Sequence, residues 1–453
     1  MAEATNGAAP ARRRLSAPLL WLAVFLPLFV GYLATSTVEE DRLSPDPVAA
    51  ALPAWRLANY GDLNLDGMGY NNIWVQEAEG RRVSNRQPGV ILTGVPFYAV
   101  LSRNPTLVSL FPAAVAASTV TAAAVACLVL AFRRLVETRT AVAAGGLLAV
   151  GTSTWSVSAD SLWPHGPDQL YLAVGMVFLA REAYVGTGVG YALAVLTRTH
   201  LAAAAAVVGI WHSVWRRSPR PAIAVGVPTA MAVAAVAFYV RHITGRWDLK
   251  AEIGGSGAAR SLREQPGWTF AENIAGFLFS PDRGLLVVSP FLLVLLPGLV
   301  AAWRVAPPWV RSSAVGGVVY LLVQARLNYF TGGDRFWGYR LSLETLTLAS
   351  PLLVLSWREW VSVRAWRRSL FAALAVLAIG YQAVGAILFD SPPYHWSGWT
   401  HSWLRDVLVA APYRGTARGI VICSLVAAPI AAILAARPFG RFKPAPVSAD
   451  GPG

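Results

Sequence analysis

Lysine and cysteine are almost absent from this chain of 453 residues. Positive charge is carried by arginine, with Lys250 and Lys443 as the exceptions. Cys127 and Cys423 both lie inside apolar runs, where cysteine usually acts as a small hydrophobic residue. No CxxC, HExxH, P-loop or GxGxxG pattern stands in a usable context. The sequence therefore gives no sign of a disulfide framework, a zinc site or a common nucleotide-binding fold.

Charged residues are scarce as well, at 14% of the chain against about 25% in a soluble domain. Hydrophobic residues make up 55%. A charge deficit of this size, spread over the whole length, means that most side chains face lipid or other apolar side chains. The sequence predicts an all-α polytopic membrane protein.

The formal net charge of +14 raises the question of nucleic acid binding. Many arginines, however, stand in short clusters at the ends of apolar runs, as the positive-inside rule expects of cytoplasmic loops. These clusters are Arg12, Arg13 and Arg14; Arg133 and Arg134; Arg216, Arg217 and Arg220; Arg364, Arg367 and Arg368; and Arg437 and Arg441. The charge therefore indicates topology, and we expect no nucleic acid partner.

About twelve apolar runs are predicted to span the membrane, given that roughly 20 apolar residues suffice to cross it. The first, residues 15–34, shows no small-x-small cleavage site followed by a soluble domain, so we interpret it as a span and not as a signal peptide. The others are residues 106–132, 139–158, 168–181, 186–198, 200–214, 222–241, 284–303, 312–330, 341–357, 369–389 and 418–436. Three runs within 168–214 are short and would cross as tilted or buried helices. The run 88–101 is interpreted as interfacial or re-entrant, because a span there would move Arg133 and Arg134 outside.

This topology divides the chain into a cytoplasmic tail (1–14), a transmembrane domain (15–436) and a disordered cytoplasmic tail (437–453). The predicted outer loops are residues 35–103, 242–283, 331–340 and 390–417. They hold 16 of the 24 acidic residues and many tryptophans. We therefore expect a multi-pass protein of the cell membrane with both termini inside and its active site on the extracytoplasmic side.

The intramembrane ionisable candidates are Asp160, Arg198, Arg326 and Glu344, and on the predicted topology each lies within a turn or two of the outer end. A transporter driven by protons or sodium usually has such groups near mid-membrane. The observed distribution instead favours an enzyme that works on a lipid head group at the outer leaflet.

Acidic residues follow the first span directly, at Glu39, Glu40, Asp41 and Asp46. One well-placed carboxylate in this loop could deprotonate an acceptor hydroxyl, and burial under neighbouring loops would tune its pKa. The alternative is a solvated run of charges, which the run by itself favours.

Two further segments carry candidate polar residues. His165 stands at an outer turn close to Asp168 and could bind phosphate, orient an acceptor or cap a helix, and a structural role is equally compatible. Ser280-Pro281 is typical of a turn that opens a helix near Gly284, with Arg283 in its first turn. A helix start with an arginine can hold a lipid phosphate, although an ordinary capped helix is the simpler interpretation.

The third loop, NYFTGGDRFWGYR (328–340), is dense in glycine, aromatic residues and arginine. Glycine allows close backbone approach, aromatic rings offer faces for sugar stacking, and arginine offers phosphate contacts. Two arginines in an outer loop run against the positive-inside bias, which weakens a purely structural explanation. The candidate donor-binding residues here are Asp334, Arg335, Trp337, Tyr339 and Arg340.

Taken in order, an acidic first loop, LWPHGP, LFSPDRGLLVVSP and GGDRFWGYR resemble the membrane glycosyltransferases of the GT-C superfamily, in particular bacterial proteins similar to family 39 protein mannosyltransferases. The resemblance covers residues from about 35 to 400. SNRQPGVILTGVPFY (84–98) is similar to the segment that closes the first loop in that family. The family commonly has a small residue and proline where Gly338-Tyr339-Arg340 stands, so Tyr339 signals a different donor or acceptor.

The resemblance implies a polyprenyl-phosphate sugar donor, used at the outer face without a nucleotide, and an aspartate of the first loop as catalytic base. The family's acid stands some fifteen residues before a G-x-x-x-L-D stretch. Here that stretch is Gly61 to Asp66, which selects Asp46, with Asp41 as the second choice. Some relatives with paired acids use a divalent metal, but no ligand set here indicates one and no cofactor is expected.

The function expected from the sequence is transfer of a sugar to a cell-envelope glycan, lipid or protein acceptor. Arg283, Arg335 and Arg340 would hold the donor phosphate, and His165 would lie near the active cavity. A flippase or exporter of lipid-linked sugars is the main alternative, but it would need polar groups through the full membrane depth. A non-catalytic scaffold is a second alternative. Within the enzyme class, a pentose or arabinofuranosyl donor competes with mannose.

Overall fold

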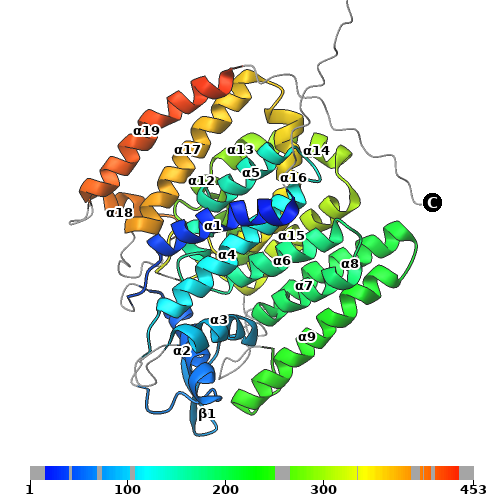
Figure 1. The fold of residues 1–453 in the computed structure, drawn as a ribbon, viewed down its shortest axis with the longest axis vertical. Helices are drawn as coiled ribbons and strands as arrows, with labels where there is room; N and C mark the ends of the chain where they lie inside the picture. Colours follow the sequence, from blue (N-terminus) through cyan, green and yellow to red (C-terminus); the bar gives the residue numbers. More distant parts are fainter. Residues whose placement is uncertain are drawn as a thin grey trace, which may run out of the picture.

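The computed structural model describes residues 16–39, 43–68, 74–102, 108–249, 266–333, 335–388, 398–400, 402–409 and 414–437. Helices make up most of this part of the chain (Figure 1). The α-helices are α1 (Ala17–Thr35), α2 (Pro45–Tyr60), α3 (Pro88–Leu101), α4 (Phe111–Phe132), α5 (Thr138–Val150), α6 (His165–Leu179), α7 (Tyr184–Thr197), α8 (Ala202–Arg216), α9 (Arg220–Thr244), α11 (Gly267–Phe279), α12 (Leu285–Val288), α13 (Phe291–Leu295), α14 (Leu299–Val305), α15 (Pro308–Leu327), α16 (Leu343–Ser356), α17 (Ala365–Leu388), α18 (Trp403–Val409) and α19 (Arg414–Ala436). Short 3₁₀ or π turns are η2 (Thr154–Ser158), η3 (Thr199–Leu201), η4 (Leu296–Gly298) and η5 (Trp357–Val361).

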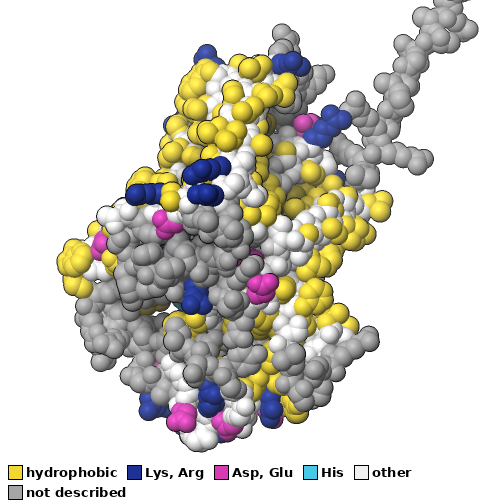
Figure 2. Space-filling view, turned by 90° about the vertical axis from the view of Figure 1, so that its left-hand side faces the viewer, with side chains coloured by type: hydrophobic (Ala, Val, Ile, Leu, Met, Phe, Trp, Pro, Cys, Tyr) yellow, Lys and Arg dark blue, Asp and Glu magenta, His cyan; other side chains and the backbone are white. Residues whose placement is uncertain are grey.

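Five of the helices are long and apolar enough to cross a membrane: α1, α4, α9, α17 and α19. Their outer faces carry large hydrophobic side chains such as Ile422, Leu425 and Ile433 of α19, as lipid contact requires. Figure 2 shows hydrophobic side chains over much of the described surface, with both signs of charge at the lower end and further charged side chains at mid-height and at the upper end. The prediction of an all-α polytopic membrane protein is confirmed, while the count of twelve spans stays a prediction.

Every predicted span contains helix, but two are not continuous α-helices. Residues 139–158 form α5 and, after a gap, η2. Residues 284–303, expected as a single span, form α12, α13, η4 and α14 in succession. Pro290 and Pro297 interrupt the segment because proline lacks a backbone N–H and clashes with the preceding turn. From Phe291 to Val305 the helical elements follow one another without a gap.

Small residues allow the helices to approach closely. α4 is buried along most of its length between α1 and α6, and α7 packs on both α6 and α9 (Figure 1). A Cβ added at Gly188 of α7 would lie 2.2 Å from the Ala224 carbonyl oxygen of α9. Lipid tails are as apolar as the side chains, so hydrophobicity does not drive helices together in a membrane. Close packing at small residues such as glycine does so instead.

The first predicted outer loop is itself structured. It contains α2 and α3 and a hairpin of β1 (Val75–Ala78) and β2 (Arg81–Ser84), all at one end of the molecule (Figure 1). The hairpin was not predicted, although its turn residues Glu79 and Gly80 both take left-handed φ, +50° and +71°, as a two-residue β-turn requires. The Ser84 hydroxyl donates to the Ala49 carbonyl oxygen at 2.5 Å and so fixes β2 against α2. Helix α11, inside the second predicted loop, was also not foreseen.

Candidate active site

Asp46 lies in the first turn of α2, the helix of the first loop. Pro45 occupies the first helical position, where its missing N–H costs nothing, and an acidic residue in the first turn complements the helix dipole. The side chain nevertheless points into the protein, and Asp46 is only 5% exposed. This burial contradicts the alternative of a solvated run of charges at this residue.

Two arginines hold the Asp46 carboxylate, one on each oxygen. Arg86, which lies just before α3, donates from Nη1 to Oδ1 at 2.6 Å. Arg340, from the third predicted loop, donates from Nη1 to Oδ2. The three residues form an ion-paired cluster, here called the Asp46 clamp, that joins three segments far apart in the sequence.

Both arginines of the clamp are also anchored by other groups. Arg86 donates to Asn85 Oδ1 from Nε at 3.0 Å and from Nη2 at 2.6 Å, and its guanidinium lies 4.5 Å from the ring centroid of Trp74. Arg340 stacks on Trp163 and Phe336, at 4.8 and 5.0 Å from their ring centroids. Such cation–π contacts hold a planar guanidinium in a fixed orientation.

The electrostatics of the clamp favour an ionised Asp46. Burial raises the pKa of its carboxyl, but the charges of Arg340 and Arg86 outweigh burial and lower the pKa from 3.8 to about 2. Arg198 adds a smaller effect in the same direction. Asp46 is therefore an anion at neutral pH, but a weak proton acceptor while both arginines contact it.

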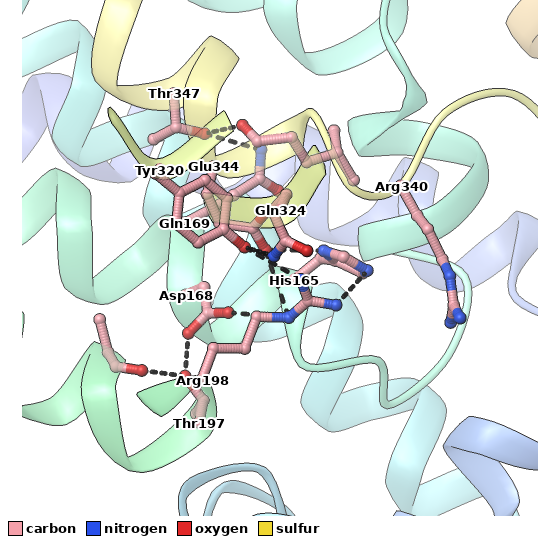
Figure 3. A network of polar contacts seen from close by, with 12 residues as sticks. His165, Asp168, Gln169, Thr197, Arg198, Tyr320, Gln324, Arg340, Glu344 and Thr347 are labelled. Atoms are coloured by element: carbon pink, nitrogen blue, oxygen red, sulfur yellow. Dashed lines mark hydrogen bonds and ion pairs between the residues drawn. The ribbon is translucent and has the colours of Figure 1, made fainter. Parts of the chain in front are cut away.

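A second polar cluster is buried between α6, α7, α15 and α16 (Figure 3). His165, the first residue of α6, has Nδ1 2.7 Å from Glu344 Oε1 and Nε2 3.2 Å from Arg198 Nη2. A guanidinium can only donate, so Nε2 accepts and the proton is assigned to Nδ1, which donates to Glu344. Figure 3 shows Arg340 beside this cluster.

Arg198 joins the members of this second cluster. It donates to the Tyr320 hydroxyl at 2.9 Å, and its Nε lies 3.6 Å from Asp168 and 3.8 Å from Glu344. Asp168 also accepts from the Thr197 hydroxyl. Charges this deeply buried need partners of opposite sign, and Arg198 is the cation that Asp168 and Glu344 share. The predicted residue His165 thus sits in a fixed network, with no exposed surface of its own.

The remaining predicted residues of the third loop take different positions. Trp337 is 0% exposed and donates from Nε1 to the Tyr381 carbonyl oxygen at 3.0 Å. Tyr339 is 1% exposed, and its hydroxyl lies 3.0 Å from that of Ser289. Neither ring offers an open face for sugar stacking in this conformation, because each packs inside the helix bundle. Arg335 is exposed, with a left-handed φ of +54°.

Arg283 precedes α12 and does not lie in its first turn, which corrects the sequence interpretation. Gly284 is the N-cap of that helix. The Arg283 guanidinium is buried and donates from Nη1 to the carbonyl oxygens of Phe336 and Gly338, at 2.6 and 3.0 Å. It therefore fixes the backbone of the loop that carries Arg340. Asp41 and Asp334 lie outside the described residues.

Arg86 is the member of the site that sequence reasoning missed. It stands in the segment compared with the end of the family's first loop, but was given no role of its own. Arg86 lies in an acid-rich outer loop, where the positive-inside rule expects few arginines. The same reasoning that singled out the arginines of the third loop could therefore have singled out Arg86. In the described part of the chain, no three or more His, Cys, Asp or Glu side chains are grouped to hold a metal ion.

Comparison with solved structures identifies the fold. The chain is similar to ArnT from Cupriavidus metallidurans bound to undecaprenyl phosphate, with a TM-score of 0.54 and 14% identity over 92% of this chain and 72% of that one. It also matches apo ArnT from the same organism (TM-score 0.48, 14% identity, 93% and 76% coverage). A third match is the apo Archaeoglobus fulgidus oligosaccharyltransferase (TM-score 0.46, 11% identity, 89% and 59% coverage).

No family model matches the sequence, and no curated protein matches it at a significant level. The match to ArnT shows that this chain shares the fold of that protein, in agreement with the resemblance predicted from the sequence. The narrower resemblance to family 39 stays a prediction.

Proposed function

We propose that this protein is a GT-C glycosyltransferase that moves a sugar from a polyprenyl-phosphate donor to a cell-envelope glycan, lipid or protein acceptor at the outer face of the membrane. The observation that carries the proposal is the Asp46 clamp: a buried carboxylate and one arginine from the first outer loop, joined by a second arginine from the third loop of a GT-C fold. An acid beside fixed cations is what transfer from a phosphate leaving group needs. The ArnT structure, bound to undecaprenyl phosphate, supports this donor class.

The chemistry assigns one role to each member of the clamp. The acceptor hydroxyl oxygen forms the new bond to the sugar's anomeric carbon as the bond from that carbon to the phosphate oxygen breaks. Asp46 takes the hydroxyl proton, and polyprenyl phosphate leaves with the electron pair of the broken bond. Arg86 and Arg340 stabilise the negative charge that develops on the phosphate, which is usually the largest catalytic contribution in such a site.

Other predicted residues support the clamp in this proposal. Arg283 and the buried ring of Trp337 hold the third loop so that Arg340 faces Asp46. His165 belongs to the buried cluster beside Arg340 and positions that region. Asp41 is the second choice as base, and Asp334 and Arg335 remain candidates for contact with the donor.

Transfer itself tests the proposal. Purified protein in detergent is incubated with a panel of radiolabelled polyprenyl-phosphate sugars and an envelope-glycan extract, and wild type is compared with Asp46→Asn. Asp62→Asn is the matched control, because Asp62 also pairs with an arginine, Arg56 at 2.6 Å, but is exposed. We expect transfer of one sugar that Asp46→Asn abolishes and Asp62→Asn retains.

Two other outcomes would point elsewhere. Transfer that survives Asp46→Asn would move the base to Asp41 or another loop acid. No transfer from any donor, together with movement of lipid-linked sugar across reconstituted vesicles, would contradict the transferase assignment in favour of a flippase.

A further inference from the structure

The Asp46 clamp has the form of an anion site that is already filled. Its carboxylate is buried, and each oxygen accepts from a different arginine. A carboxylate and a phosphate present the same kind of acceptor oxygens to arginine, in similar directions. The groups around Asp46 would therefore suit a phosphate at the same place.

The two arginines are held in place by contacts that do not involve Asp46. Asn85 and the ring of Trp74 fix Arg86, while Trp163 and Phe336 fix Arg340. Withdrawal of the carboxylate would leave two oriented guanidinium groups facing one space. Pre-oriented donors of this kind bind an incoming anion without the cost of ordering their side chains.

The clamp also has one more donor than the carboxylate uses. Arg340 Nε is buried and has no hydrogen-bond partner among the described residues. Asp46 offers two oxygens, and each already accepts from an arginine. A phosphate monoester such as undecaprenyl phosphate offers three non-bridging oxygens, one more than the carboxylate, so it can satisfy the donor that Asp46 leaves unmatched. The diester of a sugar donor offers two non-bridging oxygens, in a tetrahedral and not a planar arrangement.

We propose that Arg86 and Arg340 form a phosphate site that Asp46 occupies in the free protein, and that the phosphate of a lipid-linked donor exchanges with this carboxylate. The inference deepens the proposed function and rests on it for the donor class. Anion exchange at the clamp can nevertheless be measured without any transfer of sugar.

Exchange would also switch on the base. The charged groups that act on Asp46 are Arg86, Arg340 and, more weakly, Arg198. Once phosphate takes the first two, burial remains and the neighbouring phosphate adds negative charge, and both raise the pKa of the Asp46 carboxyl. Asp46 would then accept a proton only when a donor is bound, so an empty site would not activate acceptors.

Binding of undecaprenyl phosphate in detergent micelles tests the exchange. The proteins compared are wild type, Asp46→Asn, Arg86→Gln, Arg340→Gln and the control Asp62→Asn. Removing an internal competitor raises the binding-competent fraction, so Asp46→Asn should bind about tenfold more tightly than wild type. Each arginine variant should bind about tenfold more weakly, and Asp62→Asn should be unchanged. A purely structural Asp46 would give weaker binding when replaced.

Two further ligands separate the possible sources of the phosphate. Inorganic phosphate that binds Asp46→Asn more tightly than wild type would show that the site takes the head group alone. A response to undecaprenyl phosphate alone would show that the lipid chain is required. Either result supports the exchange. Undecaprenol, which lacks the phosphate, should bind all variants with equal affinity. Tighter binding of undecaprenol to Asp46→Asn than to wild type would contradict the exchange.

A measurement on the wild-type protein covers the case in which Asp46→Asn does not fold. Infrared difference spectra should show a carboxylate band that moves when undecaprenyl phosphate is added and stays still with undecaprenol. Lipid phosphate that binds without moving this band would overturn the exchange. So would a folded Asp46→Asn protein whose affinity is unchanged or lower. Exchange without sugar transfer would contradict only the proposed function, and transfer without exchange would contradict only this inference.

Discussion

Replacing Asp46 by asparagine should destabilise the protein at neutral pH by a measurable amount. The arginines lower the pKa of the carboxyl from 3.8 to about 2, and a shift of that size corresponds to about 2 kcal/mol of net stabilisation of the ionised form. Asparagine keeps the size but loses the charge, which leaves Arg86 and Arg340 facing each other. Breaking a buried pair in this way costs about 3–5 kcal/mol. We expect the free energy of unfolding to fall by about 2–4 kcal/mol.

Reversible unfolding in detergent at pH 7, followed by circular dichroism, measures the difference. Asp62→Asn is the reference, because the Arg56–Asp62 pair is exposed and should contribute only about 0.5 kcal/mol. The pKa of Asp46 is depressed by folding, so its contribution is fully present above about pH 4 and is lost as the pH falls toward about 2. An Asp46→Asn protein as stable as Asp62→Asn at pH 7 would refute the clamp as a stabilising contact.

Three further predictions follow from the same geometry. If donor binding frees Asp46, the pKa of its carboxyl is higher in the donor complex than in the free protein. The acid-side fall of kcat, which reports the complex, should then occur at a higher pH than that of kcat/KM, which reports the free protein. Coincident profiles would contradict the release of Asp46. Glu344→Gln removes the carboxylate that pairs with His165 and leaves Asp168 as the remaining carboxylate beside Arg198, so stability should drop by about 1–3 kcal/mol in the unfolding assay, and an unchanged stability would contradict this. Gly338 has a φ of +80°, and an added Cβ would lie 2.3 Å from a neighbouring hydroxyl oxygen, so Gly338→Ala should lower stability by about 1–3 kcal/mol. Gly226 lies on a helix with open space around the position of an added Cβ, so the control Gly226→Ala should leave stability unchanged.

The helices could be predicted because hydrophobic runs and proline positions are local signals. The break in residues 284–303 was visible in principle, since Pro290 and Pro297 stand inside an apolar run, but hydropathy alone gives a single span. The hairpin over residues 75–84 carries several charged residues, so its strands lack the alternation of apolar and polar residues by which strands are predicted. Its Glu-Gly turn was the available signal, because both residues need left-handed φ.

The site could be predicted only in part. Spacing before the Gly61–Asp66 stretch singled out Asp46, and the anomalous charge of the third loop singled out Arg340. That the two would touch was not predictable, because they are 294 residues apart in the sequence and no local pattern links them. The same holds for His165 and Glu344, at 179 residues. The burial of Trp337 and Tyr339 was not predictable, because composition does not say which rings of the third loop pack inward.

The long sequence separations within the clamp bear on how the protein is made. Asp46 and Arg86 leave the ribosome early, whereas Arg340 follows only after most of the helices have been synthesised. Until then the buried carboxylate has one of its two cations. A nascent or truncated chain that ends before the third loop could insert its first helices but could not complete the site. Completion of the clamp thus requires that synthesis and insertion have passed residue 340, well beyond the midpoint of the chain.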